Sequence, residues 1–248
     1  MRTLSLTALM LTLSAAACGD QEIMSVESDL PVAASQAEQG FGMAASATYK
    51  VTVENRTAGQ PFTPPLAAVH RKPLRLFEMG KPASHMIQEL SENGNLDPML
   101  GALGGNDHVK DVVVAFGPTV DPLLPGESVT FEIAGEQGAK YFSLVSMLVC
   151  TNDGFTGTAG RRLPQQVGDI TTMYAGGYDA GTEINTEVFA NLVPPCSGGV
   201  TGTGVSDPSL AENGVVHHHQ GIQGIADLIP GIHGWSGAVA RIEIERIG

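Results

Sequence analysis

The chain has 248 residues, of which 42% are hydrophobic, and this is enough to bury the core of one large domain. Its 31 glycines and 15 prolines favour many short elements joined by turns, and therefore an all-β architecture over a helical one. The 13 basic and 26 acidic residues give a net charge of −13, which argues against nucleic acid or an anionic membrane surface as a partner and suits a cation or a basic partner.

The N-terminal segment has the pattern of an export signal. One Arg is followed by an apolar stretch and then by three alanines that lead into Cys18. The stretch is too short for a spanning helix, and a cysteine after small residues resembles a lipobox, in which the cysteine is lipidated and becomes the mature N-terminus. We therefore expect residues 1–17 to be a signal peptide and Cys18 to be a lipid anchor, the only membrane attachment of the chain. Plain secretion is the alternative, because Ala15 stands where a lipobox prefers a branched residue.

Residues 18–47 have the composition of a tether. They show no sustained hydrophobic period and are rich in Ser, Ala, Gln and Glu, which is typical of disordered segments. We therefore expect lipidated Cys18 and a disordered tether up to residue 47, and one folded domain over residues 48–248.

The folded domain is expected to begin and end with strands that pair. Tyr49, Val51 and Val53 alternate with polar residues, which is the period of two of a half-buried strand. Residues 239–247 alternate in the same way, with Ile242 and Ile244 on the apolar face.

Further strands and two helices are expected between the terminal strands. Residues 111–116 and 141–149 are continuous apolar runs suited to central sandwich strands, while residues 128–133 alternate and turn Glu132 away from the core. A helix is predicted over residues 82–93, with Pro82 near its first turn and Gly94 at its end, and a shorter one over 97–103.

Two cysteines remain once Cys18 is set aside. An exported protein meets an oxidising environment in which a surviving pair tends to be bridged. Cys150 and Cys196 allow one connectivity, so we expect a disulfide between them. Two buried free thiols are the alternative.

An Asn-Asp pair follows the apolar run, in the sequence TNDGFTG at residues 151–157. Asn and Asp bond their own backbone and Gly tolerates a positive φ, so these residues are typical of a tight turn. An Asp at the end of a buried strand is also a candidate metal ligand. The local sequence leaves both interpretations of Asp153 open.

Six stretches carry the most distinctive sequence: residues 49–70, 146–157, 178–187, 193–196, 217–224 and 240–247. Together they resemble the spondin amino-terminal domain, as it occurs in bacterial secreted proteins and lipoproteins; the animal relatives are F-spondin and mindin. The resemblance runs from Thr48 to Ile247, and its most specific parts are the NDGF turn and YDAGTE. It implies an all-β fold, an antiparallel β-sandwich resembling calcium-dependent membrane-binding modules, with one or two short helices.

The resemblance also implies a calcium site. In the animal members a calcium ion lies at one end of the sandwich, held by a Glu from one strand and two Asp residues from loops. Carried over by position, the ligands are Glu132, Asp153 and Asp179, with Glu136 as a rival for Glu132 because the alignment there crosses a variable stretch. Calcium takes six to eight oxygen ligands, so the side chain of Asn152 and loop carbonyls can complete the shell.

Two further carboxylates follow Asp179 closely in the sequence. Glu183 and Glu187 are expected to be solvated surface groups, and of the two only Glu183 is considered, as a weak candidate, for an additional ligand.

Three consecutive histidines at 217–219 raise the question of a transition metal. In an extended segment His217 and His219 point the same way and His218 points oppositely. Zinc sites usually draw on three or four convergent ligands, so a loop-packing role is favoured over a zinc site. Nucleophile-elbow and phosphate-binding motifs are absent from the sequence.

Two classes of function remain. The first is a calcium-binding adhesion or ligand-binding module at the cell surface, with an unidentified protein or glycan as its partner, since animal spondin domains act in matrix and cell adhesion. The second is a metal-dependent hydrolase of the cell envelope, which needs a deep pocket and a second perturbed group beside the metal. A site made of carboxylates carries no obvious general base, so a non-enzymatic module is favoured. The expected location is the cell envelope, lipid-anchored at the outer membrane or cell surface, and otherwise periplasmic or secreted.

Overall fold

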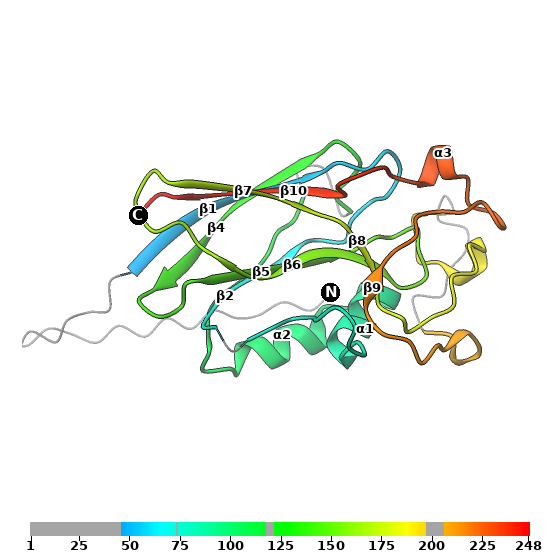
Figure 1. Cartoon of the computed structure of the whole chain (residues 1–248), viewed down its shortest axis with the longest axis horizontal. Coiled ribbons are helices and arrows are strands. Elements are labelled where there is room, and N and C mark those ends of the chain that lie inside the picture. Colours follow the sequence, from blue (N-terminus) through cyan, green and yellow to red (C-terminus); the bar gives the residue numbers. More distant parts are fainter. Residues whose placement is uncertain (1–45, 73, 118–121, 197–205) are drawn as a thin grey trace, which may run out of the picture. The chain divides into compact units, whose positions relative to one another are not determined.

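Two antiparallel sheets packed face to face form the centre of the molecule (Figure 1). The computed structural model describes residues 46–72, 74–117, 122–196 and 206–248, which all belong to one compact unit. The all-β sandwich expected from the sequence is confirmed. The predicted signal peptide, Cys18 and most of the tether lie outside the described residues.

The first sheet has four strands, in the order β4 (Ser128–Glu136), β1 (Ser46–Asn55), β10 (Ala240–Arg246) and β7 (Ile170–Ala175). The predicted pairing of the terminal strands is confirmed, because Val51 stands opposite Ile244 and Val53 opposite Ile242. β1 begins at Ser46, two residues before the expected start of the domain.

The second sheet has six strands, in the order β3 (Val109–Val114), β2 (Leu66–His70), β5 (Tyr141–Met147), β6 (Gly154–Arg162), β8 (Gly177–Asp179) and β9 (His217–His218). β5 lies inside this sheet, as its apolar run predicts. β3 is an edge strand paired only with β2 within the sheet and is largely half-buried, so the prediction that residues 111–116 form a central strand was wrong. A run of valines reports apolar neighbours on its faces and not how many strands flank it.

Two hydrophobic clusters explain the apolar runs. The main core lies between the sheets and includes Val51, Ile242 and Phe142. The other face of the six-stranded sheet packs against α1 (His85–Asn93) and α2 (Asp97–Gly104), which lie below it in Figure 1. β5 is therefore covered on both faces, and this is why it is mostly apolar and buried from Phe142 to Met147.

Both predicted helices are present, but α1 begins at His85, three residues after its predicted start, and α2 ends one residue after its predicted end. The Ser84 hydroxyl accepts a hydrogen bond from the Ile87 N–H at 3.4 Å, and Gly94 ends α1 with a φ of 67°. Pro82 precedes the helix and is not within it. The remaining short elements are η1 (Phe189–Asn191), η2 (Pro208–Leu210) and α3 (Pro230–His233). In the part of the chain that the structure describes, the helices are too short or too polar to cross a bilayer.

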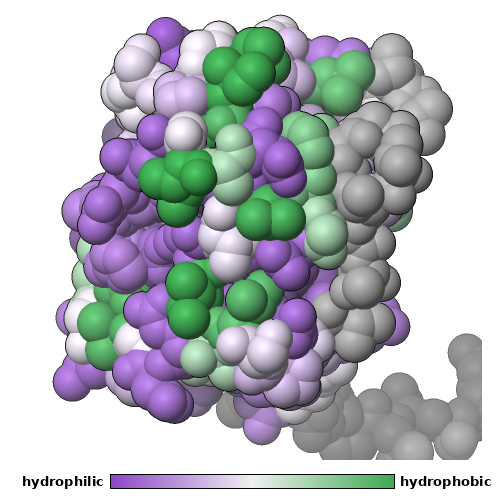
Figure 2. All heavy atoms as spheres, turned by 90° about the vertical axis from the view of Figure 1, so that its right-hand side faces the viewer, coloured by the Kyte–Doolittle hydropathy of each residue, from purple (hydrophilic) through white to green (hydrophobic). Residues whose placement is uncertain are grey.

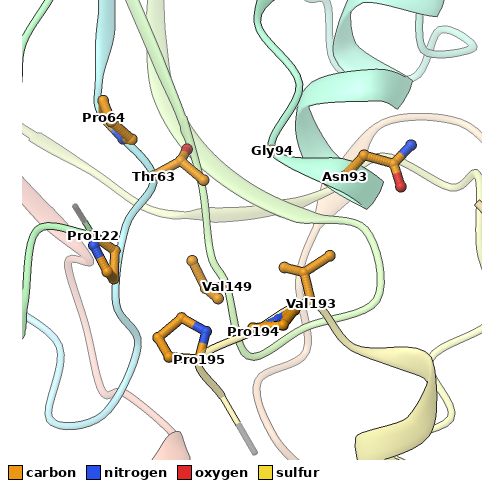
Figure 3. A pocket seen from close by; sticks show the side chains of 9 residues that line it. All are labelled: Thr63, Pro64, Asn93, Gly94, Pro122, Val149, Val193, Pro194 and Pro195. Carbon is orange, nitrogen blue, oxygen red and sulfur yellow. The ribbon is translucent and has the colours of Figure 1, made fainter. Parts of the chain in front are cut away.

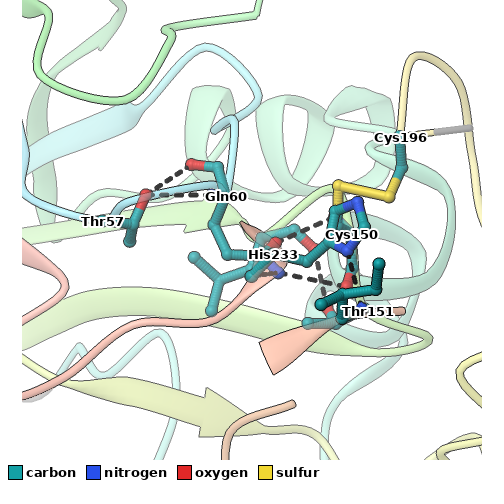
Figure 4. The surroundings of a disulfide bond; sticks show 8 residues. Thr57, Gln60, Cys150, Thr151, Cys196 and His233 are labelled. Carbon is teal, nitrogen blue, oxygen red and sulfur yellow. Dashed lines mark hydrogen bonds between the residues drawn. A yellow bond between two sulfur atoms is a disulfide. The ribbon is translucent and has the colours of Figure 1, made fainter. Parts of the chain in front are cut away.

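The predicted disulfide between Cys150 and Cys196 is present, with a Cα–Cα distance of 5.1 Å (Figure 4). Beside it, the Gln60 side chain accepts from the Cys150 N–H at 2.9 Å and donates to the carbonyls of Cys150 at 3.1 Å and His233 at 2.6 Å. The bond therefore ties the segment before Cys196 to the turn that leads from β5 into β6.

Removal of this disulfide is expected to lower the free energy of unfolding by about 2 to 4 kcal/mol, the typical range for a native bridge. Its 46-residue separation closes a long loop in the unfolded chain. Denaturant unfolding of the Cys150→Ser/Cys196→Ser double variant measures the loss. Reducing agent should shift the midpoint of the wild type and leave that of the double variant in place; an unchanged wild-type midpoint would contradict the prediction.

Candidate metal centre

A tight turn at the end of β5 positions Asp153. The Thr151 hydroxyl donates to the Leu148 carbonyl at 2.6 Å and accepts from the Gly154 N–H at 2.8 Å. A Cβ on Gly154 would lie 2.3 Å from that hydroxyl oxygen, so glycine is required where β6 begins. The turn predicted from TNDGFTG therefore exists, and it directs Asp153 into the protein.

The carboxylate of Asp153 is completely buried and only half satisfied. Its Oδ2 accepts three hydrogen bonds: from the Thr182 N–H at 2.7 Å, the Thr182 hydroxyl at 3.2 Å and the Glu183 N–H at 3.1 Å. Its Oδ1 has no hydrogen-bond partner. A buried acceptor without a partner is costly, so this oxygen is a natural position for a cation.

Strand pairing brings Asp179 to the same place. In the β6–β8 register Gly154 stands opposite Asp179, which is 3% exposed. The Asp179 carboxylate accepts from the Gly181 N–H at 2.8 Å and from the Asn185 side-chain amide at 2.6 Å. Of the three ligands implied by the resemblance, the structure thus brings Asp153 and Asp179 together.

Glu132 does not join this pair. It is exposed on β4 of the four-stranded sheet, opposite Lys50 in the register. Its rival Glu136 lies within reach of Arg71 at 3.5 Å and Lys110 at 3.4 Å, so its charge is already compensated. The alternation along β4 that points Glu132 away from the core also points it away from Asp153.

Glu183 is the third carboxylate of the site. The expectation that Glu183 and Glu187 are solvated surface groups was wrong, since they are 4% and 5% exposed. The Glu183 carboxylate accepts from the Asp207 N–H at 3.1 Å. Glu187 acts differently, because its two oxygens accept from the N–H groups of Gln223 and Ile225 and fix that loop.

The electrostatics follow from burial. Burial raises the pKa of Asp153 to about 7, the charge of Asp179 adds to the rise, and the N–H groups of Thr182 and Glu183 oppose it. Burial also raises the pKa of Glu183 to about 7; the Asp207 N–H opposes this, and the charges of Glu92 and Asp153 add to it. Ionising both groups therefore costs free energy that a bound cation would offset.

The three histidines lie as the extended-segment argument predicts. His217 and His219 line a cavity of about 240 Å³ together with Asp179 and Glu187, while His218 stacks on Tyr178 with ring centroids 5.4 Å apart. The His219 Nδ1 accepts from the Gly221 N–H at 2.9 Å, so that nitrogen is not free for a metal.

The donor atoms of the site are oxygens, as calcium prefers, but they do not converge on one point. Among the described residues, no three His, Cys, Asp or Glu side chains are placed to hold a metal together. Asp153, Asp179 and Glu183 offer hard oxygen donors, so calcium would need adjusted carboxylates together with amide or carbonyl oxygens or water.

A second cavity, of about 480 Å³, is apolar (Figure 3). Its described lining residues are Thr63, Pro64, Asn93, Gly94, Pro122, Val149, Val193, Pro194 and Pro195. Val149 and Pro195 place it beside the disulfide. None of these lining residues is charged, so this cavity is separate in character from the carboxylate cluster.

Comparison with known proteins agrees with the fold. The family model Spondin_N matches residues 48–191. The match covers β1 to η1 and includes Asp153, Asp179 and Glu183. No curated protein matches the chain. Spondin domains are extracellular modules of the adhesion type, and the chain belongs to the Spondin_N family.

Proposed function

We propose that this chain is a calcium-binding adhesion or ligand-binding module of the cell envelope, with its calcium site at Asp153, Asp179 and Glu183. The observation that carries the proposal is the Oδ1 atom of Asp153, which is buried without a partner while two more buried carboxylates lie nearby. Glu183 takes the place that the resemblance gave to Glu132, because Glu183 is buried and interacts with Asp153.

Apolar side chains next to these ligands supply a surface for a partner. Ile184 is 50% exposed and directly follows Glu183, and Ile225 is 67% exposed although its N–H is held by Glu187. Figure 2 looks onto the end of the molecule that lies at the right of Figure 1, where separate hydrophobic side chains stand among hydrophilic ones. A cation that orders the 179–187 segment would therefore also order this surface.

Binding of the labelled mature protein to intact cells of its source tests this function. We expect binding in millimolar calcium and release by a chelator. Ile225→Ser should weaken binding severalfold, because it removes an exposed apolar contact beside the site. Ile170→Ser is the matched control, since Ile170 is 56% exposed but begins β7. Equal binding with calcium and with chelator would contradict the proposal.

The alternative of a metal-dependent hydrolase has less support from the site. The cavity beside Asp179 holds His219 and Glu187, but both carboxylate oxygens of Glu187 accept from backbone N–H groups and the Nδ1 of His219 accepts from another. A general base must be free to take a proton from water. The adhesion-type function is therefore the one we propose.

Attachment through Cys18 completes the proposal. Mass spectrometry of the native N-terminus should find residues 1–17 removed and acyl chains on Cys18. Cleavage downstream of Cys18, or release of the unacylated chain into the medium, would favour plain secretion.

A further inference from the structure

Glu92 is a buried acid without compensation. It lies in the last turn of α1, is 5% exposed, and neither of its carboxylate oxygens has a hydrogen-bond partner. The C-terminal end of a helix carries a partial negative charge, so an acidic side chain there is also disfavoured by the helix dipole. A group in this position needs a counter-charge or must stay neutral.

The neighbours of Glu92 are oxygen donors. The charge of Glu92 acts on Glu183, which also interacts with Asp153. The next residue, Asn93, has a buried Oδ1 without a partner, and its amide donates to the Ser206 hydroxyl at 3.0 Å. Because the Asp207 N–H donates to Glu183, the Ser206–Asp207 segment connects the end of α1 to the metal centre.

No basic side chain neutralises this group in the described structure. None of the ion pairs there joins a Lys or Arg to Glu92, Asp153, Asp179 or Glu183. The internal segments outside the described residues, 118–121 and 197–205, contain no Lys, Arg or His in their sequence. A bound cation is therefore the counter-charge that the described structure leaves open for Glu92.

We propose that Glu92 and Glu183 hold a second calcium ion next to the one at Asp153 and Asp179, so that Glu183 serves both ions. The Asn93 Oδ1 is a further donor within the same segment. The inference rests on the proposed calcium site, because Glu183 belongs to both. Carboxylate oxygens, an amide oxygen and water are the ligands that calcium takes, and one carboxylate between two cations is a recurrent arrangement in two-metal sites.

Counting bound calcium by equilibrium dialysis of the mature protein tests the second site. We expect two ions per chain in the wild type and one in Glu92→Gln. Glu89→Gln is the matched control on the same helix and should keep two ions, because the Glu89 carboxylate already accepts from the Asn95 amide at 2.9 Å. In metal-free buffer Glu92→Gln should melt at a higher temperature than the wild type, since an amide of the same shape is never charged and needs no counter-ion in this buried position.

The outcomes separate the two proposals. Two ions in both the wild type and Glu92→Gln, or one ion in both, would overturn the second site and leave the first intact. No bound calcium in the wild type would overturn both. A Glu92→Gln variant that melts lower than the wild type in metal-free buffer would identify Glu92 as a structural hydrogen-bonding group and would also overturn the inference.

Discussion

Calcium bound at the Asp153 and Asp179 site is expected by itself to raise the free energy of unfolding by about 2.7 kcal/mol at a hundredfold excess over its dissociation constant and by about 4.1 kcal/mol at a thousandfold excess. The reason is that the ion binds the folded chain, where strand pairing places Asp153 beside Asp179, and not the unfolded one. Magnesium should stabilise less, because it demands a tighter octahedral shell and gives up its waters reluctantly. Melting in calcium, magnesium and chelator measures the effect.

Substitutions separate the two candidate ligand sets. Asp153→Asn, Asp179→Asn and Glu183→Gln should each remove most of the calcium-dependent shift in melting temperature. Glu132→Gln is the control, because Glu132 is exposed on the other sheet. Glu187→Gln is unsuited as a control, since Glu187 lines the cavity beside Asp179 and holds the Gln223–Ile225 loop.

Loss of the calcium-dependent shift in Glu132→Gln, together with its retention in Glu183→Gln, would restore the ligand set implied by the resemblance. A wild type that melts identically in calcium and in chelator would mean that the Asp153 turn is only a turn.

Most of the fold could be predicted because its signals are local. Alternation in β1 and β10 and the apolar run of β5 report which faces of these strands are buried, and Gly94 marks the end of α1. The position of β3 could not be predicted, because strand order depends on partners far away in the sequence. An apolar run of valines fits an edge strand covered by helices as well as a central strand.

The residues of the candidate site could likewise be predicted where the signal is local, and not where it depends on distant parts of the chain. Asp153 and Asp179 stand in recognisable motifs; Asp153 directly precedes β6, and Asp179 ends β8. The sequence did not predict that Glu183 is buried, because its burial depends on the turn after β8. In this turn the Thr182 and Glu183 N–H groups donate to Asp153. Glu92 was missed entirely, since a helix of the second hydrophobic cluster carries it to Glu183 from 91 positions earlier in the chain. An acid in the last turn of a helix without basic partners was the one signal that the sequence offered.

The stability of the metal-free protein should depend on pH through Asp153. Its pKa is near 3.8 in the unfolded chain and about 7 in the folded one, so the folded state binds the proton more tightly. An acid whose pKa is higher in the folded chain stabilises the fold fully at pH values below its pKa in the unfolded chain. This stabilisation is lost as the pH rises through its pKa in the folded chain. At about 1.36 kcal/mol per pH unit, flattening as the folded pKa is reached, Asp153 contributes a loss of about 2 kcal/mol between pH 5 and pH 7. Glu183, with its pKa raised to about 7, acts in the same direction.

Comparison of the wild type with Asp153→Asn isolates this contribution. Burial lowers the pKa values of His70 and His219. A lowered histidine pKa makes the fold more stable as the pH rises, which is opposite to the effect of the carboxylates. This histidine contribution is the same in the wild type and in Asp153→Asn. Denaturant unfolding in metal-free buffer from pH 5 to pH 8 should therefore show the wild type losing about 2 to 3 kcal/mol more than Asp153→Asn. Asp107→Asn, at an exposed position, should follow the wild type. Calcium should reverse the trend, because it requires the ionised carboxylate and binds more tightly as the pH rises. Parallel curves for the wild type and Asp153→Asn in metal-free buffer would mean that Asp153 is already ionised at pH 5 and that burial does not hold its proton.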